Sequence, residues 1–267
     1  MRLRLDLLTI YGMAFLVFLY APVLLLPLFS FNDNTFAVFP LRGFTLQAYV
    51  DLAHNDSLLN ALRSSLMVAG SVSVFSTIFG LLGAMAVTRY RLPGRGPIMG
   101  VIMLPLVVPS IILAVALLIV VRQAFDLPLT LFTVGAGHIL LCVPFSMLVL
   151  ISRLEGFDKS LEEAANDLGE NGWMTFWRVT FPLALPGIVS SLLMAFTVSF
   201  DEYVIAFFLS GINQTLPIFL YSQLRFPDRL PMTEALGSCI LFASTIIVVA
   251  SELLRRSGVK SARPTGL

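Results

Sequence analysis

Six long apolar stretches constrain this chain more than any other feature of its sequence. They cover residues 7–29, 61–87, 98–121, 131–151, 183–209 and 236–254. Each stretch has roughly the 20 residues that an α-helix needs to cross a hydrocarbon layer of about 30 Å. In lipid the backbone must satisfy its own hydrogen bonds, which a helix does within one segment. The sequence therefore predicts an all-α integral membrane protein with six transmembrane helices.

The composition agrees with a lipid environment. Charged residues are 12% of the 267 residues and the AVILMFWYC fraction is 57%, whereas an average soluble domain is about 25% charged. The net charge of +1 gives no reason to expect a nucleic-acid partner. Cys142, Cys239, His54 and His138 are isolated from other metal-ligating residues, so we assign them structural roles.

The charges that flank the stretches predict the orientation. Arg2 and Arg4 precede the first stretch as in a signal peptide, but residues 7–29 are too long for one and no cleavage pattern follows. We therefore interpret this stretch as a retained helix. With the N-terminus in the cytoplasm, twelve of the 17 Lys and Arg residues fall on the cytoplasmic side. The positive-inside rule then places both termini in the cytoplasm.

Two patterns inside the stretches predict close or kinked helix packing. Small residues form a stripe that another helix can approach closely, at Ala69, Ser73, Ser76, Gly80 and Gly83. Prolines, which kink helices, occur in apolar runs at Pro105, Pro109 and Pro144. Both patterns also occur in static helix bundles, so they discriminate little between functions.

About thirty residues separate the fourth and fifth stretches, more than two adjacent helices need. Ser160 and Glu163 have the spacing of a capping box, which predicts a helix that starts at Ser160. Gly169 is placed to end that helix in a left-handed conformation. The face of this helix has apolar residues at helical spacing, which are Leu161, Ala164, Ala165 and Leu168.

A second short helix, predicted at 173–179, would bring Trp173, Phe176 and Trp177 to one side. Aromatic residues of this kind are enriched at protein interfaces. The alternative is an amphipathic helix on the lipid surface, but such helices usually carry Lys and Arg. Here acidic residues dominate, namely Glu155, Asp158, Glu162, Glu163, Asp167 and Glu170. A protein partner therefore fits better than a lipid surface.

At this point the segment resembles a known motif. Glu163-Ala164-Ala165, three further residues and Gly169 are similar to the EAA loop of bacterial ABC importer permeases. That motif ends in Ile-x-Leu-Pro, and here the same position reads Val179-Thr180-Phe181-Pro182, with two apolar replacements. Further on, SFDEYVIAFFLSG and the LPIFLYSQLRF that follows resemble spermidine/putrescine importer permeases of the PotC type.

The resemblance implies a type I ABC importer permease fold in the bacterial inner membrane. Residues 1–57 would form the first helix and an extracytoplasmic loop, 58–252 the transmembrane domain with its EAA loop at 155–182, and 253–267 a cytoplasmic tail. The implied partners are a second permease subunit, expected to be a different chain, two ATPase subunits that bind ATP and Mg²⁺, and an extracytoplasmic binding protein.

The same resemblance implies which residues couple the permease to the ATPases. In this family the EAA helices dock into a groove on each ATPase subunit. Carried over to this sequence, the coupling residues are Glu163, Ala164, Ala165, Gly169, Trp173, Phe176 and Trp177. Glu163 would hold the start of the helix, Gly169 its turn, and the three aromatic residues the contact surface.

The chain shows no motif for chemistry of its own. It has no G-x-x-x-x-G-K-[ST] phosphate loop, and neither of its two lysines, Lys159 and Lys260, follows a glycine. No Ser-His-Asp set or metal-ligand cluster occurs at a recognisable spacing. We therefore expect no catalysis and no cofactor in this chain.

An acidic pair lies inside the fifth stretch. Asp201 and Glu202, followed by Tyr203, have apolar residues on both sides, where carboxylates are costly and usually face a cavity or a partner. Facing the pathway, they would suit a polycationic substrate. Ser199 and Glu202 also have the spacing of a second capping box, so the helix would break and restart there instead. The sequence supports both interpretations.

Other classes of protein fit less well. A secondary transporter would need ion-coupling residues and usually two repeated halves, and an intramembrane enzyme would need a catalytic constellation. Neither pattern is evident in the sequence. The polyamine assignment depends on resemblance alone, and another small polar solute, such as an amino-acid derivative, is the alternative within the same class.

Overall fold

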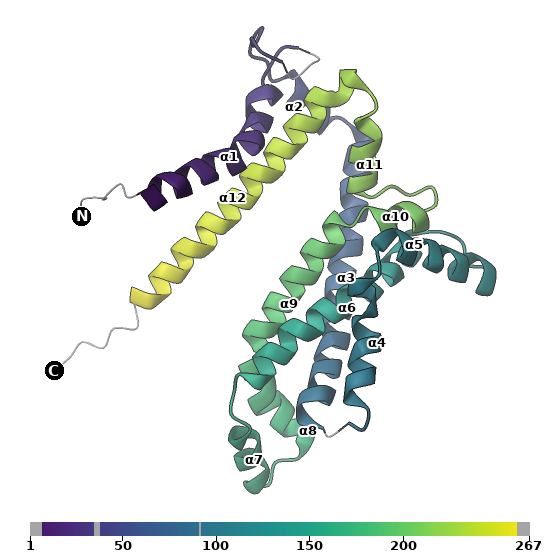
Figure 1. The fold of residues 1–267 in the computed structure, drawn as a ribbon, viewed down its shortest axis with the longest axis vertical. Helices are drawn as coiled ribbons and strands as arrows, with labels where there is room; N and C mark the ends of the chain where they lie inside the picture. The colour runs from purple at the N-terminus through teal and green to yellow at the C-terminus, as the bar shows by residue number, and fades with distance from the viewer. Residues whose placement is uncertain (1–6, 35–37, 91, 261–267) are drawn as a thin grey trace, which may run out of the picture. The chain divides into compact units, whose positions relative to one another are not determined.

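The computed structural model of the chain describes residues 7–34, 38–90 and 92–260, and the regular elements of this part are helical (Figure 1). Arg2, Arg4 and the end of the predicted tail, 261–267, lie outside the described residues. The chain divides into two compact units, one from Met1–Asp56 and Leu220–Leu267 and the other from Ser57–Phe219. Each unit is described by itself.

The first unit pairs the two ends of the chain. The end of helix α1 (Leu7–Ser30) contacts α12 (Leu230–Lys260), and the short helix α2 (Gln47–Ala53) also contacts α12 (Figure 1). An isolated bridge between Asn32 and Phe44 closes the loop from α1 to α2. A pocket of about 470 Å³ opens in this unit. Its charged lining residues are Asp33, Arg42, Asp51 and Asp228.

The second unit holds the remaining helices. In chain order they are α3 (Asp56–Arg89), α4 (Arg95–Val107), α5 (Ser110–Ile119), α6 (Leu131–Glu155), α7 (Ser160–Asp167), α8 (Gly172–Thr175), α9 (Phe181–Asp201) and α10 (Val204–Leu209). Helix α11 (Leu216–Gln223) starts in this unit, and its residues from Leu220 onward belong to the first unit. Helices α6 and α9 pack along each other, and α10 packs against α5 and α6. One buried cluster lies around Val72, Val134 and Ile205. A second lies around Val87, Met147 and Ala184.

The predicted stripe of small residues on α3 lies at a helix contact. Ala69 and Ser76 are fully buried. A Cβ placed on Gly80 would lie 2.7 Å from the Cβ of Ser146 on α6, and one on Gly83 would lie 3.0 Å from the Sδ of Met147. The absence of side chains at these two glycines lets α3 and α6 approach closely, as predicted.

The number of spans differs from the prediction. Among the described residues, four helical segments are long and apolar enough to cross a membrane, at Leu7–Ser30, Asp56–Arg89, Leu131–Glu155 and Gly172–Asp201. A bent pair, Arg95–Val107 with Ser110–Ala124, makes a fifth if it is one span. The sixth predicted span falls within α12 and stays a prediction.

The prediction of one helix over 98–121 is wrong. Helices α4 and α5 meet at an angle of 103° at Val108 and Pro109. Val108 is extended, with φ −73° and ψ 130°, because a proline ring disfavours helical geometry in the residue before it. The sequence predicted a kink at Pro109, and the structure has a break.

Candidate functional site

The segment from Asp158 to Thr180, here named the coupling loop, links α6 to α9. Its first helix, α7, begins at Ser160 as predicted, but the predicted Ser160–Glu163 capping box does not form, because Lys159 is already helical and Ser160 lies in the first turn. The Ser160 amide instead donates to Asp158 Oδ1 at 3.0 Å. This bond and one from the Ser160 hydroxyl lower the pKa of the Asp158 carboxyl. Asp158 therefore replaces Ser160 as the capping side chain.

Gly169 ends α7 in the predicted left-handed conformation, with φ +90°. The amide of Gly169 donates to the Asn166 carbonyl at 2.9 Å, and the amide of Glu170 donates to the Ala165 carbonyl at 3.1 Å. These bonds satisfy carbonyls at the end of the helix. The turn reverses the chain into α8.

The three aromatic residues of the coupling loop form one cluster, as predicted. Ring centroids are 5.8 Å apart for Trp173 and Trp177, and 5.1 Å apart for Phe176 and Trp177. The segment that carries them is α8 followed by a π-helical turn at Phe176–Thr180, which runs directly into α9. Continuous helical backbone therefore joins the cluster to α9.

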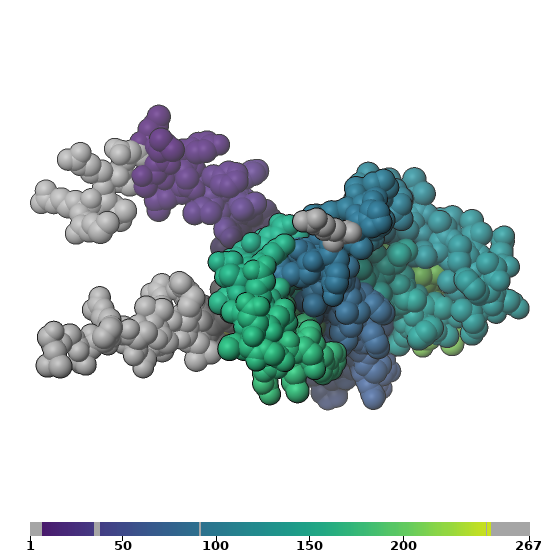
Figure 2. Space-filling view, turned by 90° about the horizontal axis from the view of Figure 1, so that it is seen from below, coloured from purple at the N-terminus to yellow at the C-terminus, as the bar shows by residue number. Residues whose placement is uncertain are grey.

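Apolar side chains of the coupling loop face away from the rest of the second unit. Leu168 is 87% exposed and Trp173 is 68% exposed. Leu161, Ala164 and Trp177 are also exposed. Figure 2 views the molecule from below, the end at which Figure 1 places α7 and α8, so the surface of this end is turned towards the viewer. Exposed apolar residues grouped in this way are typical of a protein interaction site.

Glu162, rather than Glu163, fixes α7 to the helices of the unit. Its Oε2 lies 2.7 Å from Nε of Arg89, at the end of α3. Its Oε1 accepts a hydrogen bond of 2.7 Å from the hydroxyl of Thr180. The Glu163 side chain is exposed. Sequence reasoning missed Glu162 and Arg89, since neither stands out among the acidic and basic residues of its segment.

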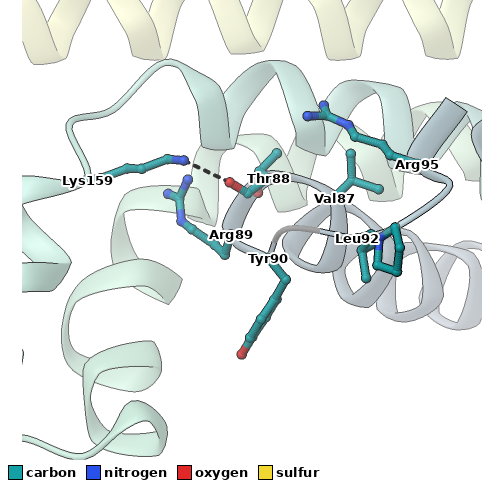
Figure 3. Close-up of a pocket in the computed structure, with 8 residues that line it drawn as sticks. Val87, Thr88, Arg89, Tyr90, Leu92, Arg95 and Lys159 are labelled. Atoms are coloured by element: carbon teal, nitrogen blue, oxygen red, sulfur yellow. Dashed lines mark hydrogen bonds between the residues drawn. The ribbon is translucent and has the colours of Figure 1, made fainter.

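A second contact joins the coupling loop to α3 next to this ion pair. The ammonium group of Lys159 donates to the Thr88 carbonyl at 3.0 Å (Figure 3). Both residues line an open pocket of about 530 Å³ together with Arg89 and Arg95. A cation at a helix C-terminus stabilises the carbonyl end of the helix dipole. Two side chains of the coupling loop, Lys159 and Glu162, thus contact the last turn of α3.

The acidic pair lies where the fifth apolar stretch breaks. Helix α9 ends at Asp201 and α10 starts at Val204. Oε1 of Glu202 accepts from the amides of Val204, at 2.9 Å, and Ile205, at 3.1 Å. Asp201 is exposed and Tyr203 is partly buried. Glu202 therefore caps the restarted helix.

Of the predicted Ser199–Glu202 capping box, only Glu202 acts as a cap, and the prediction for Ser199 is wrong. Ser199 lies inside α9, and its hydroxyl is 2.9 Å from Nδ1 of His138 on α6. Both side chains are buried. His138 has the structural role predicted for it, and it ties α6 to α9 just before the break.

These features define a class of protein. Long apolar helices make the chain a multi-pass membrane protein, and an exposed segment with α7 and the turn at Gly169 leads from the candidate span at Leu131–Glu155 into the one at Gly172–Asp201. Residues 76–257 match the family described as binding-protein-dependent transport system inner membrane component, and the chain belongs to this family. It is therefore the permease component of an ABC importer and not its ATPase.

Relatives of known function cover most of the chain. It is 34% identical to the spermidine/putrescine transport system permease protein PotC of Escherichia coli strain K12, over 92% of this chain and 93% of the relative. It is also 34% identical to the putrescine transport system permease protein PotI of the same strain, over 86% and 84%. The PotC protein of Haemophilus influenzae is 32% identical over 90% and 92%.

Solved structures confirm the fold. A bacterial ABC transporter involved in import of the acidic polysaccharide alginate superposes with a TM-score of 0.71 at 18% identity, covering 92% of this chain and 93% of that one. The MetNI methionine ABC transporter superposes with a TM-score of 0.56 at 19% identity, covering 72% and 95%. The predicted ABC importer permease fold is therefore confirmed, whereas its count of six spans is not.

Proposed function

We propose that this chain forms one half of an inner-membrane pathway that imports a polyamine such as putrescine or spermidine. Membership of the binding-protein-dependent family implies an ATPase and a periplasmic binding protein as partners. The assignment of a polyamine as substrate depends on the 34% identity to PotC and to PotI, over 92% and 86% of this chain. The alternative is another small polar solute, such as an amino-acid derivative.

Carboxylates of the structure suit a polycationic substrate. Asp201 is exposed beside the break between α9 and α10. In the first unit, Asp33, Asp51 and Asp228 line one pocket with a single basic residue, Arg42. Carboxylates attract an ammonium group and replace part of the hydration that it loses. A polyamine carries two or more such groups.

The exposed apolar face of the coupling loop supports docking of an ATPase. In this proposal Glu163, Ala164, Ala165, Gly169 and the aromatic cluster at Trp173, Phe176 and Trp177 form the contact. ATP and Mg²⁺ bind to the two ATPase subunits, and closure of these subunits moves the coupling loop. The second permease subunit is a different chain, and the coupling loop and both termini lie in the cytoplasm.

The division of the chain is part of the same proposal. Residues 58–252 form the transmembrane domain that contains the loop at 155–182. They follow an N-terminal helix with its extracytoplasmic loop at 1–57 and precede a tail at 253–267. Attachment of a membrane-impermeant thiol reagent to Leu168→Cys, applied from either side of sealed vesicles, tests the orientation. Labelling from the outside of intact cells would overturn it.

A binding and uptake scan tests the substrate. The partner binding protein is titrated with putrescine, spermidine and a set of unrelated amino acids. Uptake of the ligands that bind is then measured in vesicles that contain the whole transporter. We expect saturable, ATP-dependent uptake of a polyamine. Tight binding and uptake of an amino-acid derivative, without competition by either polyamine, would replace this proposal by its alternative.

A further inference from the structure

The contacts between α3 and the coupling loop carry an inference about how movement crosses the permease. We propose that Arg89 and Glu162 are positioning residues that make α3 follow the coupling loop. This inference rests on the proposed function, in which the ATPases move that loop. It concerns two residues outside the surface that would touch an ATPase.

Glu162 joins three segments of the unit with one side chain. Its two oxygens bind different partners, Arg89 at the end of α3 and Thr180 at the start of α9, both at 2.7 Å. The carboxylate itself belongs to α7. When α7 moves, Glu162 therefore pulls on both helices at once.

The ion pair is shielded from water. The side chains of Arg89 and Glu162 are 11% and 16% exposed. Removing one partner of such a pair leaves the other charge buried without compensation, which is far more costly than losing an exposed pair. Loss of Glu162 would therefore leave the Arg89 guanidinium buried without a counter-charge, unlike loss of a partner from a surface ion pair.

Arg89 also has contacts other than the one with Glu162. Its Nη2 donates to the Leu154 carbonyl of α6 at 3.3 Å, and its guanidinium lies 4.7 Å from the ring centroid of Phe157. Lys159 binds the neighbouring Thr88 carbonyl (Figure 3). These contacts restrict the guanidinium, so that displacement of Glu162 acts on α3 through a side chain with little freedom. Nε meets Glu162 as an ion pair without hydrogen-bond geometry, and Nη1 has no hydrogen-bond partner among the described residues.

Helix α3 extends from this contact to the opposite end of the unit. It has 34 residues, which at 1.5 Å per residue corresponds to about 50 Å. Near its start, the Ser65 hydroxyl accepts from the Leu216 amide at 2.8 Å. Asn60 and Arg63 line a pocket of about 510 Å³ together with Asn213 and Gln214. A displacement of Arg89 along the helix axis therefore reaches a polar pocket far from the coupling loop.

The chain offers a matched control for this contact. Glu170 pairs with Arg178 within the same loop, and the Arg178 side chain is 63% exposed. This second pair does not include a residue of α3. Glu162→Gln and Glu170→Gln therefore make the same chemical change in the same loop, and only the first change removes the ion pair with α3.

The first measurement is ATP hydrolysis by the assembled transporter in vesicles, with and without the binding protein. We expect Glu162→Gln to lower the stimulation by binding protein roughly threefold to tenfold, the range of a modest coupling free energy. The basal rate and the amount of ATPase that co-purifies should be unchanged, and Glu170→Gln should match the wild type. Equal stimulation in Glu162→Gln and wild type would overturn the inference.

The second measurement follows the two elements directly. Spin labels are placed on Leu82→Cys of α3 and Leu168→Cys of the loop, both exposed positions, after replacement of the exposed Cys239 by Ser. The distance between the labels should be narrowly distributed and unchanged by ATP in the wild type, and should broaden or shift with ATP in Glu162→Gln. A narrow, unchanged distance in Glu162→Gln would contradict the inference.

A third label distinguishes failure of the inference from failure of the proposed function, and a double variant distinguishes it from failure of assembly. If the distance from Leu168 to a label on the other ATPase subunit, the one that does not dock on this chain, does not change with ATP in the wild type, the proposed function fails and not the inference. If Glu162→Gln does not assemble, Arg89→Gln with Glu162→Gln removes both charges. We expect that double variant to assemble and to lose stimulation, and wild-type stimulation in it would overturn the inference.

Discussion

Nε of Arg89 and Oε2 of Glu162 lie 2.7 Å apart, although α4, α5 and α6 separate the two residues in the chain. The contact brings the last turn of α3 against the first turn of α7. Together with Lys159 and Thr180, it makes the coupling loop part of the helical unit rather than a loose connection. The predictions below test the parts of this arrangement one at a time.

Gly169→Val should uncouple transport while leaving membrane insertion intact. Valine resists the φ of +90° that Gly169 adopts, at a cost of about 1 kcal/mol or more. No atom lies within 4 Å of a Cβ at this position, so the strain is confined to the backbone. Uptake and stimulated ATP hydrolysis are the measurements. Gly172→Val, also without a neighbour within 4 Å, is the control, and equal behaviour of the two variants would refute the prediction.

Trp173→Ala should weaken docking of the ATPase without destabilising the permease. Trp173 is 68% exposed, and an aromatic anchor of this kind contributes about 2 kcal/mol to an interface, or roughly a thirtyfold change in affinity. Co-purification of the ATPase with tagged permease measures the effect. Phe125→Ala, at an equally exposed aromatic residue outside the coupling loop, should retain the ATPase. Full retention by Trp173→Ala would exclude this residue from the contact.

Substitutions of the acidic pair should have different effects. Glu202→Gln keeps an oxygen for the Val204 and Ile205 amides and should transport nearly as well as the wild type. Glu202→Ala removes a helix cap and should cost about 1 kcal/mol of stability. Asp201→Asn should lower polyamine uptake, and by more for a trication than for a dication, because it removes only a charge. Uptake at saturating binding protein is the measurement, and normal uptake in Asp201→Asn would remove Asp201 from the pathway.

Gly80→Ala should destabilise the packing of α3 on α6. The new methyl group would lie 2.7 Å from the Cβ of Ser146, and overpacking of this kind typically costs about 1–3 kcal/mol. Gly70→Ala, on the same helix but with no atom within 4 Å, is the matched control. Thermal unfolding of the purified permease should show a lower midpoint for Gly80→Ala only. A similar midpoint for both variants would mean that α3 and α6 do not approach as closely as described.

Acid should loosen the start of α7. Because hydrogen bonds from Ser160 lower the pKa of Asp158, the charged form contributes stability above the ordinary carboxyl value of about 3.9. That contribution is lost as the pH falls through the lowered native pKa, and it is constant from about pH 5 to pH 8. An NMR titration of Asp158 should give a midpoint below that of an aspartate in an unstructured peptide. A midpoint at or above the peptide value would contradict the contact.

The sequence predicts those structural features that depend on a few neighbouring residues. Gly169 and the aromatic cluster were predicted because chain reversal and helical spacing act over a few residues. The bend at Val108 and Pro109 was predicted as a kink, but its size of 103° depends on what α4 and α5 pack against. A sequence pattern contains no information about that packing.

The choice between adjacent acids shows the same limit. Glu162 and Glu163 have the same chemistry, and only the position of Arg89 decides which one is held. The capping side chain at Ser160 was misassigned for a related reason, since Lys159 already has helical dihedrals and moves the cap to Asp158. In both cases the error is one or two residues, within a segment whose role was predicted.

The two helix ends at the break between α9 and α10 carry partial charges of opposite sign. A helix that ends exposes carbonyl oxygens, whereas a helix that starts exposes N–H groups, so an interrupted helix presents both signs at once. Here Glu202 covers the N–H groups of Val204 and Ile205. The carboxylate of Asp201 lies at the carbonyl end of α9, so both formal charges at the break are negative. If this break faces the pathway, as proposed, it would favour cations over anions without a binding pocket of fixed shape.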